Sequence, residues 1–196
     1  MKTRTTSFTR NLLAVSAMTF AVARGTLAAD PTAFELIKSG DPYVGMQSKD
    51  KVVAIHSEKS AASLTPDIWY VTYYDPDSTL KAVEVKFGAG QKMDVSHPLR
   101  LIEPVTGEDK ILDTAKLKVD SDRVQEIALS QPLLKNLAPK AMQFWLQHGV
   151  TGPEWKVRIW VAKINYPGQN ADIGTVNISA TDGSLVKTDL HPNSAN

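Results

Sequence analysis

The sequence predicts an α+β protein built from two tandem repeats, each a helix packed on a small antiparallel sheet. The stretch AVEVKFGAGQKMDV at 82–95 returns as VNISATDGSLV at 176–186, and in both a glycine falls seven residues after a valine of the alternating run. Upstream, IWYVTYYDPDS matches EWKVRIWVAKINYPG, with Trp69 aligned on Trp155. Alternating apolar and polar residues are typical of strands with one buried face. We therefore expect each repeat to read helix, strand, strand, tight turn, strand.

Helix start and stop signals precede each set of strands. In the first repeat, Asp30 can cap a helix, Pro31 suits its first position and Gly40 ends it. In the second repeat, Asp122 and Gln125 resemble a capping box at the start of SDRVQEIAL. These signals predict one short amphipathic helix in front of each set of strands.

A further helix is expected over 140–148, with Met142, Trp145 and Leu146 on its apolar face. The connection over 97–120 contains prolines but also ILDTAKLKV, which is too apolar for a free linker. It predicts a last strand or an arm shared between the halves. The predicted boundaries are a signal peptide at 1–28, a first repeat at 29–96, a connecting arm or strand at 97–120 and a second repeat at 121–196.

The first residues have the pattern of a secretory signal peptide. Lys2, Arg4 and Arg10 precede the apolar run LLAVSAMTFAVA, and small residues follow, so cleavage is expected after Ala28, with Ala29 as the alternative position. This run would be about 18 Å long as a helix, short of the ~30 Å core of a bilayer. Without residues 1–28 the net charge is −3 and no basic cluster remains, which argues against nucleic-acid binding. We expect a periplasmic or secreted protein with no membrane insertion after signal cleavage.

The second repeat resembles the PepSY family of secreted and periplasmic small domains. The matching features are the helix start SDRVQEIAL, the strand pattern Trp155-x-Val157-x-Ile159 and the final hairpin VNISATDGSLV. The first repeat matches less well. The resemblance implies an α+β fold with a helix on an antiparallel sheet, often in tandem, in extracytoplasmic proteins. Inhibition or chaperoning of peptidases is proposed for some members, and the family has no catalytic residues to carry over.

The histidines show no metal-binding pattern. His56, His97, His148 and His191 lack a spacing such as His-x-x-x-His, and the chain has no cysteine to supplement them. No GxSxG motif is present either. We therefore expect no catalytic residues, no metal and no cofactor.

Two short motifs imitate ligand loops. Asp75 and Asp77 resemble the start of a calcium loop, but Lys86 stands where the final glutamate belongs, so a turn with Pro76 at its second position is expected. The stretch at 88–90, GAG, resembles a phosphate cradle. Because it precedes a strand and not a helix, a turn is again expected.

The tryptophans divide into core and surface candidates. Trp69 and Trp155 occupy equivalent repeat positions, and Trp145 lies on the expected helix, so all three are predicted to anchor the core. If Trp155 faces the core, the alternation turns Trp160 outward on the other side of the sheet. An outward tryptophan is typical of a contact site for another protein.

The hairpin connection KINYPGQNADIG of the second repeat is predicted to be seven residues longer than that of the first. Its Asn165, Tyr166 and Asn170 combine an aromatic anchor with polar groups, which is typical of recognition loops. The candidate binding residues are therefore Asn165, Tyr166, Asn170 and Trp160.

The expected function is that of a periplasmic non-catalytic binding module. Its expected partner is a protein or peptide, and it could bind or inhibit an extracytoplasmic peptidase. Two alternatives are a structural envelope-associated protein and an enzyme whose site is assembled across the fold. An exposed sheet face or strand edge would favour the binding module, and a buried cluster of acidic residues and histidine would favour the enzyme.

Overall fold

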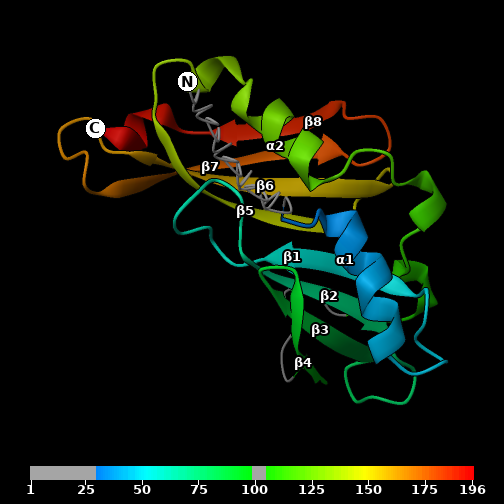
Figure 1. Ribbon diagram of the computed structural model, residues 1–196. Helices are drawn as coiled ribbons and strands as arrows, with labels where there is room; N and C mark the ends of the chain where they lie inside the picture. Colours follow the sequence, from blue (N-terminus) through cyan, green and yellow to red (C-terminus); the bar gives the residue numbers. More distant parts are fainter. Residues whose placement is uncertain (1–29, 99–104) are drawn as a thin grey trace, which may run out of the picture.

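The computed structural model describes residues 30–98 and 105–196, so the predicted signal peptide lies outside the described residues. Eight strands form one antiparallel sheet in the order β4-β3-β2-β1-β5-β6-β7-β8, and both α-helices lie on the same face of it (Figure 1). The strands are β1 Val52–Ser57, β2 Ile68–Tyr74, β3 Ala82–Gly88, β4 Gln91–Ser96, β5 Pro139–His148, β6 Pro153–Ala162, β7 Asn170–Ser179 and β8 Leu185–Leu190. The helices are α1 Ala33–Gly40 and α2 Ser121–Leu129, with short 3-10 helices η1 Asp41–Tyr43, η2 Glu108–Lys110, η3 Thr114–Lys116, η4 Pro132–Leu134 and η5 Pro192–Ala195.

The predicted fold class of two helix-on-sheet repeats is wrong. β1 pairs antiparallel with β5, through Ile55 opposite Leu146 and His56 opposite Trp145, and this pairing makes one continuous sheet. Two separate four-stranded sheets would each leave an unpaired inner edge, and joining them removes both edges. The molecule is therefore mostly one antiparallel sheet with a few short helices. The alternating pattern identifies strands, but it does not say which strand edges join.

Two buried serines complete the junction where the backbone pairing of β1 and β5 ends. The hydroxyl of Ser57 accepts the N–H of Phe144 at 3.0 Å, and the hydroxyl of Ser60 accepts the N–H of Met142 at 3.0 Å. The N–H of Ser60 donates in turn to the carbonyl of Met142 at 2.9 Å. Buried N–H groups need partners, and here side chains supply those that a longer β1 would have provided.

The helix predicted over 140–148 is wrong, because this segment forms strand β5. Met142, Phe144 and Leu146 are buried, and the residues between them are partly exposed, which is the alternation of a strand. Trp145 therefore lies on the face away from the helices and outside the predicted core. Met142 and Leu146 also fit a helical spacing. The segment forms a strand because it pairs with β1 on one side and with β6 on the other.

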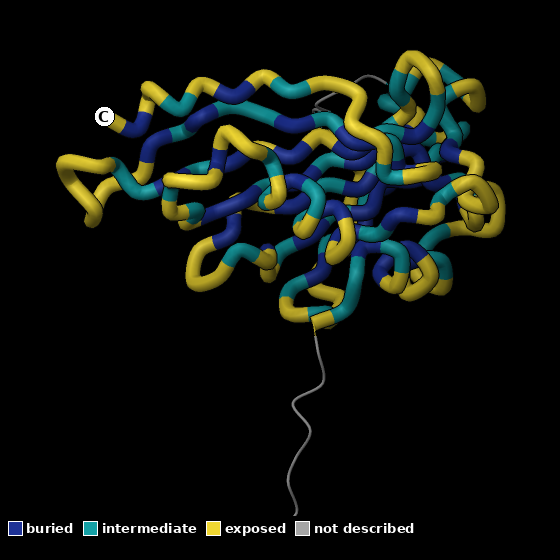
Figure 2. Tube along the Cα trace, turned by 90° about the horizontal axis from the view of Figure 1, so that it is seen from above, coloured by how far each residue is buried: buried dark blue, intermediate teal, exposed yellow. Residues whose placement is uncertain are grey.

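The hydrophobic core lies between the sheet and the helices, and Figure 2 shows the buried residues running along the strands. Trp69 and Trp155 are 4% and 0% exposed, which confirms their predicted core positions. Each indole N–H donates to a backbone carbonyl, from Trp69 to Pro66 at 2.9 Å and from Trp155 to Val119 at 2.8 Å. The ring of Phe144 has its centroid 5.8 Å from that of Trp69 and 6.4 Å from that of Trp155. This aromatic cluster crosses the junction between the halves.

The pairing register shows where the predicted alignment of the two halves fails. Trp69 of β2 pairs with Phe87, and Trp155 of β6 pairs with Ile178. The predicted alignment of β3 on β7 is therefore two residues out of register. A shift of two residues keeps each side chain on its own face, because the side-chain period of a strand is two. For that reason the alternation could not reveal the error.

The N-termini of the two helices meet, and their caps differ from the predicted ones. Asp120, not Asp122, caps α2, and its Oδ1 accepts the first N–H of that helix at 2.7 Å. The same carboxylate accepts the N–H of Phe34 in α1 at 3.1 Å. α1 begins at Ala33 and not at the predicted Pro31. One aspartate thus serves both helices.

The described part of the connecting segment, 105–120, packs against both halves of the sheet. The N–H of Leu112 donates to the carbonyl of Val52 at 2.7 Å, and the N–H of Val119 donates to the carbonyl of Ala180 at 3.0 Å. Between residues 105 and 120 the structure has η2 and η3 and no strand. Among the described helices, none has the length and apolar character needed to cross a bilayer.

Candidate functional site

The sheet has one covered face and one open face. α1 and α2 both lie on the covered face (Figure 1), where the N–H of Ala33 donates to Oγ of Ser121 at 3.1 Å. Neither α-helix lies on the other side, which we call the open face. An antiparallel sheet with a single covered face presents the other to solvent or to a partner. The open face is therefore the side of the sheet that a partner could reach.

One row of side chains crosses all eight strands on the open face, and we call it the central row. From β4 to β8 it consists of Asp94, Lys86, Tyr70, His56, Trp145, Lys156, Asn177 and Lys187. Its middle is made of rings, and lysines flank the rings on both sides. Protein interfaces have the same arrangement, with aromatic residues at the centre and charged residues toward the rim.

The rings on the β1–β3 side of the central row are held in place by their neighbours. His56 stacks on Tyr70 with ring centroids 4.7 Å apart and planes inclined by 8°. The Tyr70 hydroxyl donates to a carboxylate oxygen of Glu58 at 2.6 Å. Nζ of Lys86 lies 5.0 Å from the Tyr70 ring centroid and 3.5 Å from the same Glu58 carboxylate. These contacts hold the side chains of His56, Tyr70 and Lys86 in fixed positions.

Burial lowers the pKa of His56 to about 4, although the nearby carboxylate of Glu58 acts in the opposite direction. The imidazole is therefore uncharged at neutral pH. A neutral imidazole offers one hydrogen-bond donor and one acceptor. The positive charge of the central row consequently lies on its lysines, and its middle is uncharged.

A hollow of ≈ 550 Å³ opens on the β5–β8 half of the open face. Its lining includes Trp145, Lys156, Arg158, Asp172, Asp189 and His191. Nε of Arg158 donates to Oδ2 of Asp172 at 2.7 Å. Nε2 of His191 lies 3.2 Å from Oδ1 of Asp189. Lys156 is exposed and has no ion pair or hydrogen bond from its side chain to any described residue.

A β-bulge shapes this hollow. The register between β6 and β7 shifts between Ile159 and Trp160. On β7 the residue at the bulge is Gly174, whose φ is +109°. A Cβ on Gly174 would collide with the carbonyl oxygen of Asp189, so only glycine fits this position. The bulge places Asp172 opposite Trp160. A local irregularity thus positions one of the two carboxylates of the hollow.

Trp160 lies on the open face, as the alternation predicts. It is partly exposed, and two cations contact its ring: Nζ of Lys59 lies 4.4 Å from the ring centroid and Cζ of Arg158 lies 5.3 Å from it. These distances are typical of cation–π contacts. Much of the ring is therefore engaged within the protein, and Trp160 presents a mixed aromatic and cationic surface.

The predicted recognition loop is shorter than expected. The β6–β7 connection runs from 163 to 169 and the β2–β3 connection from 75 to 81, so both have seven residues, and the additional length of the second half lies in β6 and β7. Asn165 and Tyr166 are exposed in the loop, and Tyr166 is 63% exposed. Asn170 is the first residue of β7 and pairs with Ala162. The four predicted binding residues therefore divide between the loop, the start of β7 and the open face.

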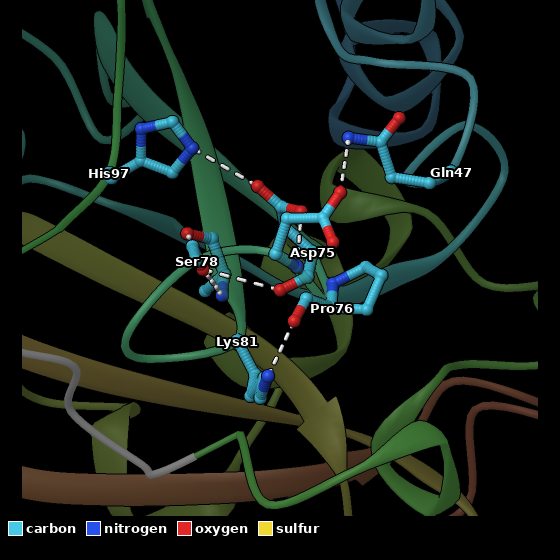
Figure 3. Close-up of polar contacts among 8 residues, drawn as sticks. Gln47, Asp75, Pro76, Ser78, Lys81 and His97 are labelled. Atoms are coloured by element: carbon cyan, nitrogen blue, oxygen red, sulfur yellow. Dashed lines mark hydrogen bonds and ion pairs between the residues drawn. The ribbon is translucent and has the colours of Figure 1, made fainter.

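The aspartates after β2 form a turn, as predicted. The N–H of Ser78 donates to the carbonyl of Asp75 at 3.3 Å. Figure 3 shows His97 reaching this turn, with Nε2 3.0 Å from Oδ2 of the buried Asp75. The side-chain amide of Gln47 donates to Oδ2 of Asp77 at 3.4 Å. Among the described residues, no group of three or more acidic, histidine or cysteine side chains is arranged to hold a metal ion.

No family model, curated protein or solved structure matches the chain. The resemblance to the PepSY family therefore stays a prediction, and the candidate site depends on the geometry of the open face.

Sequence reasoning missed the central row. The period of two predicts that Tyr70 and Thr72, or Lys156 and Arg158, share a face. It does not say that His56 and Trp145, far apart in the chain, become neighbours, because that depends on the pairing of β1 with β5. The available signal was the set of polar and aromatic residues between the core positions of each strand.

Proposed function

We propose that the protein is a non-catalytic binding protein of the cell envelope and that a protein partner docks on its open face. The central row is the observation that supports this proposal most strongly. At about 4.8 Å per strand, a row of this kind is about 34 Å long, comparable with the width of a standard protein–protein interface. Its rings are fixed in advance, which reduces the entropy lost when a partner binds.

Catalysis is less well supported than binding. His97 and Asp75 form the kind of pair in which a carboxylate orients a histidine. A nucleophile would have to lie beside that histidine. The hydroxyl of Ser78, which belongs to the same network, bonds to backbone atoms of Asp75 and Ala82 and not to His97. His56, at the centre of the open face, stacks on Tyr70 in place of contacting a nucleophile.

The two cations on the β6–β8 side of the central row give a direct test. Lys156→Glu combined with Lys187→Glu reverses two exposed charges on the open face. The amount of partner that chemical crosslinking captures from envelope extract should therefore fall at least about tenfold. Lys116→Glu with Lys118→Glu makes the same charge change on the connecting segment and should leave capture unchanged. Equal loss in both double variants, or in neither, would contradict docking on the open face.

The predicted loop contact is tested separately. Asn165→Ala with Tyr166→Ala alters exposed side chains, so the melting temperature should stay within about 2 °C of the wild type. We expect the double variant to capture less of the same partner, because Tyr166 offers a large exposed aromatic surface in the loop that joins β6 to β7. Undiminished capture would restrict the interface to the strands. The PepSY resemblance suggests an extracytoplasmic peptidase as the partner, which mass spectrometry of the crosslinked species would identify.

A further inference from the structure

The hollow over the β6–β7 bulge has features that docking of a protein does not require. It is a concave site whose volume of ≈ 550 Å³ lies within the usual range for small-molecule sites of about 300–1,000 Å³. It lies on the β5–β8 half of the open face, whereas the stacked pair of His56 and Tyr70 lies on β1 and β2. The hollow is therefore separate from this stacked pair.

The charged groups of the hollow balance one another. Arg158 is bonded to Asp172, and His191 lies against Asp189. The formal charges of Lys156 and Arg158 match those of the two aspartates, so the hollow as a whole has no strong preference for an anion or a cation. A neutral ligand that can both donate and accept hydrogen bonds suits such a site better than an ion does.

Several of these groups have hydrogen-bonding capacity to spare. At Asp172, Oδ2 accepts from Arg158 and Oδ1 accepts the N–H of Gly174 at 3.0 Å, and each oxygen has a second lone pair that can accept another hydrogen bond. Asp189 contacts His191 through Oδ1, and no contact of its Oδ2 with a described side chain is seen. Lys156 has three N–H donors and no described partner. The lining of the hollow thus contains both acceptors and donors.

Trp145 adds an apolar surface to this polar ring. It lines the hollow, and its indole Nε1 is buried and has no hydrogen-bond partner among the described residues. The ring therefore contributes area and not a hydrogen bond. A ligand that combines an apolar C–H face with hydroxyl groups at its edge would use both parts of the lining.

We propose that this hollow binds a neutral saccharide, with a pyranose ring against Trp145 and its hydroxyl groups bonded to Asp189, Lys156 and the Arg158–Asp172 pair. A pyranose has this combination of C–H face and hydroxyl edge. Its hydroxyl groups donate and accept, and they therefore match an array of paired carboxylates and cations. This site goes beyond the docking of a protein partner and does not depend on it.

The test is a calorimetric titration of the purified mature protein with cellotriose, chitotriose, maltotriose and, as an acidic counterpart, trigalacturonate. We expect at least one neutral trisaccharide to bind with a Kd of about 1 mM. Asp189→Asn should weaken that binding at least about fivefold, because an NH2 donor replaces one of the two acceptor oxygens and the negative charge is lost. Asp94→Asn, the same change at the β4 end of the open face, should leave it unchanged.

Two substitutions of Trp145 separate the ring from the fold. Trp145→Ala should weaken binding at least about tenfold. Trp145→Phe keeps an aromatic surface and removes only an N–H that has no partner, so binding should stay within about threefold of the wild type. The proposal is overturned if no neutral trisaccharide binds at up to about 20 mM, if trigalacturonate alone binds, or if Asp94→Asn weakens binding as much as Asp189→Asn. Because the titration contains no protein partner, its failure leaves the docking proposal standing.

Discussion

The backbone N of Phe34 lies 3.1 Å from Oδ1 of Asp120, so the residue that caps α2 also accepts an N–H from the first turn of α1. Phe34 belongs to the first half of the chain and Asp120 to the end of the connecting segment. A carboxylate at two helix N-termini interacts favourably with both helix dipoles. On the covered face this contact joins the halves, as the pairing of β1 with β5 joins them within the sheet.

We expect Asp120→Ala to lower the free energy of unfolding by about 2 kcal/mol, because it removes the acceptor for N–H groups of two helices. Urea denaturation would measure this loss. Asp122→Ala is the matched control: Asp122 is exposed in the first turn of the same helix, and its loss should cost no more than about 0.5 kcal/mol. A loss for Asp120→Ala as small as that of the control would show that the shared cap contributes little.

Trp69→Ala and Trp155→Ala should each lower the free energy of unfolding by about 3 to 5 kcal/mol, as truncation of a buried aromatic side chain does. Both rings are buried, and each indole N–H has a backbone partner that the substitution would leave unpaired. Thermal melts of both variants check this expectation. A variant that melts like the wild type would place its tryptophan outside the core.

The stability of the protein should depend on His56 in mild acid. Burial lowers the pKa of His56 to about 4, from 6.5 in an exposed histidine. Below pH 6.5 the unfolded chain therefore takes up a proton that the folded state resists. The contribution of His56 to the free energy of unfolding is fully present above that pH. It is lost as the pH decreases from 6.5 to 4, and the loss reaches about 3 kcal/mol.

His56→Gln isolates this contribution, because the carboxylates that titrate in the same range are present in both proteins. Urea denaturation at pH 7 and at pH 4.5 gives the loss of stability for each. The wild type should lose more than the variant. Equal losses would mean that His56 is accessible to protons in the folded state.

Gly174→Ala should lower the free energy of unfolding by about 3 kcal/mol, since the new Cβ would meet the carbonyl of Asp189 at a backbone φ that suits glycine. Gly168→Ala is the control within the same hairpin: no atom lies within 4 Å of its added Cβ. This control should change stability by less than about 0.5 kcal/mol. If both variants are equally stable, β7 can adopt another path and the bulge is not required.

Much of the fold could be predicted from local patterns. Alternation identified β2, β3, β6 and β7, and start signals placed a helix before each set of strands, although Asp120 and not Asp122 is the cap of the second. Strand β5 was missed because Met142 and Leu146 fit a helical period as well. The continuous sheet was missed because it depends on two long-range pairs, Ile55 with Leu146 and His56 with Trp145.

The same limit applies to the candidate site. The alternation correctly places Trp160 on the open face, because a face is a local property of a strand. The length of the recognition loop was overestimated, because the sequence does not show how far β6 and β7 continue their pairing beyond Trp160. The hollow requires the bulge at Gly174 and the approach of β8, and both are tertiary features.

The central claim, docking of a protein on the open face, is tested most directly by site-specific photocrosslinking. A benzophenone amino acid is placed at Lys156, which is exposed on the open face, or at Arg123, which is exposed on α2 on the covered face. Both proteins are irradiated in the same envelope extract. Docking on the open face predicts a discrete crosslinked species from position 156 that is absent from position 123. Crosslinks of equal yield from both positions, or from position 123 alone, would contradict it.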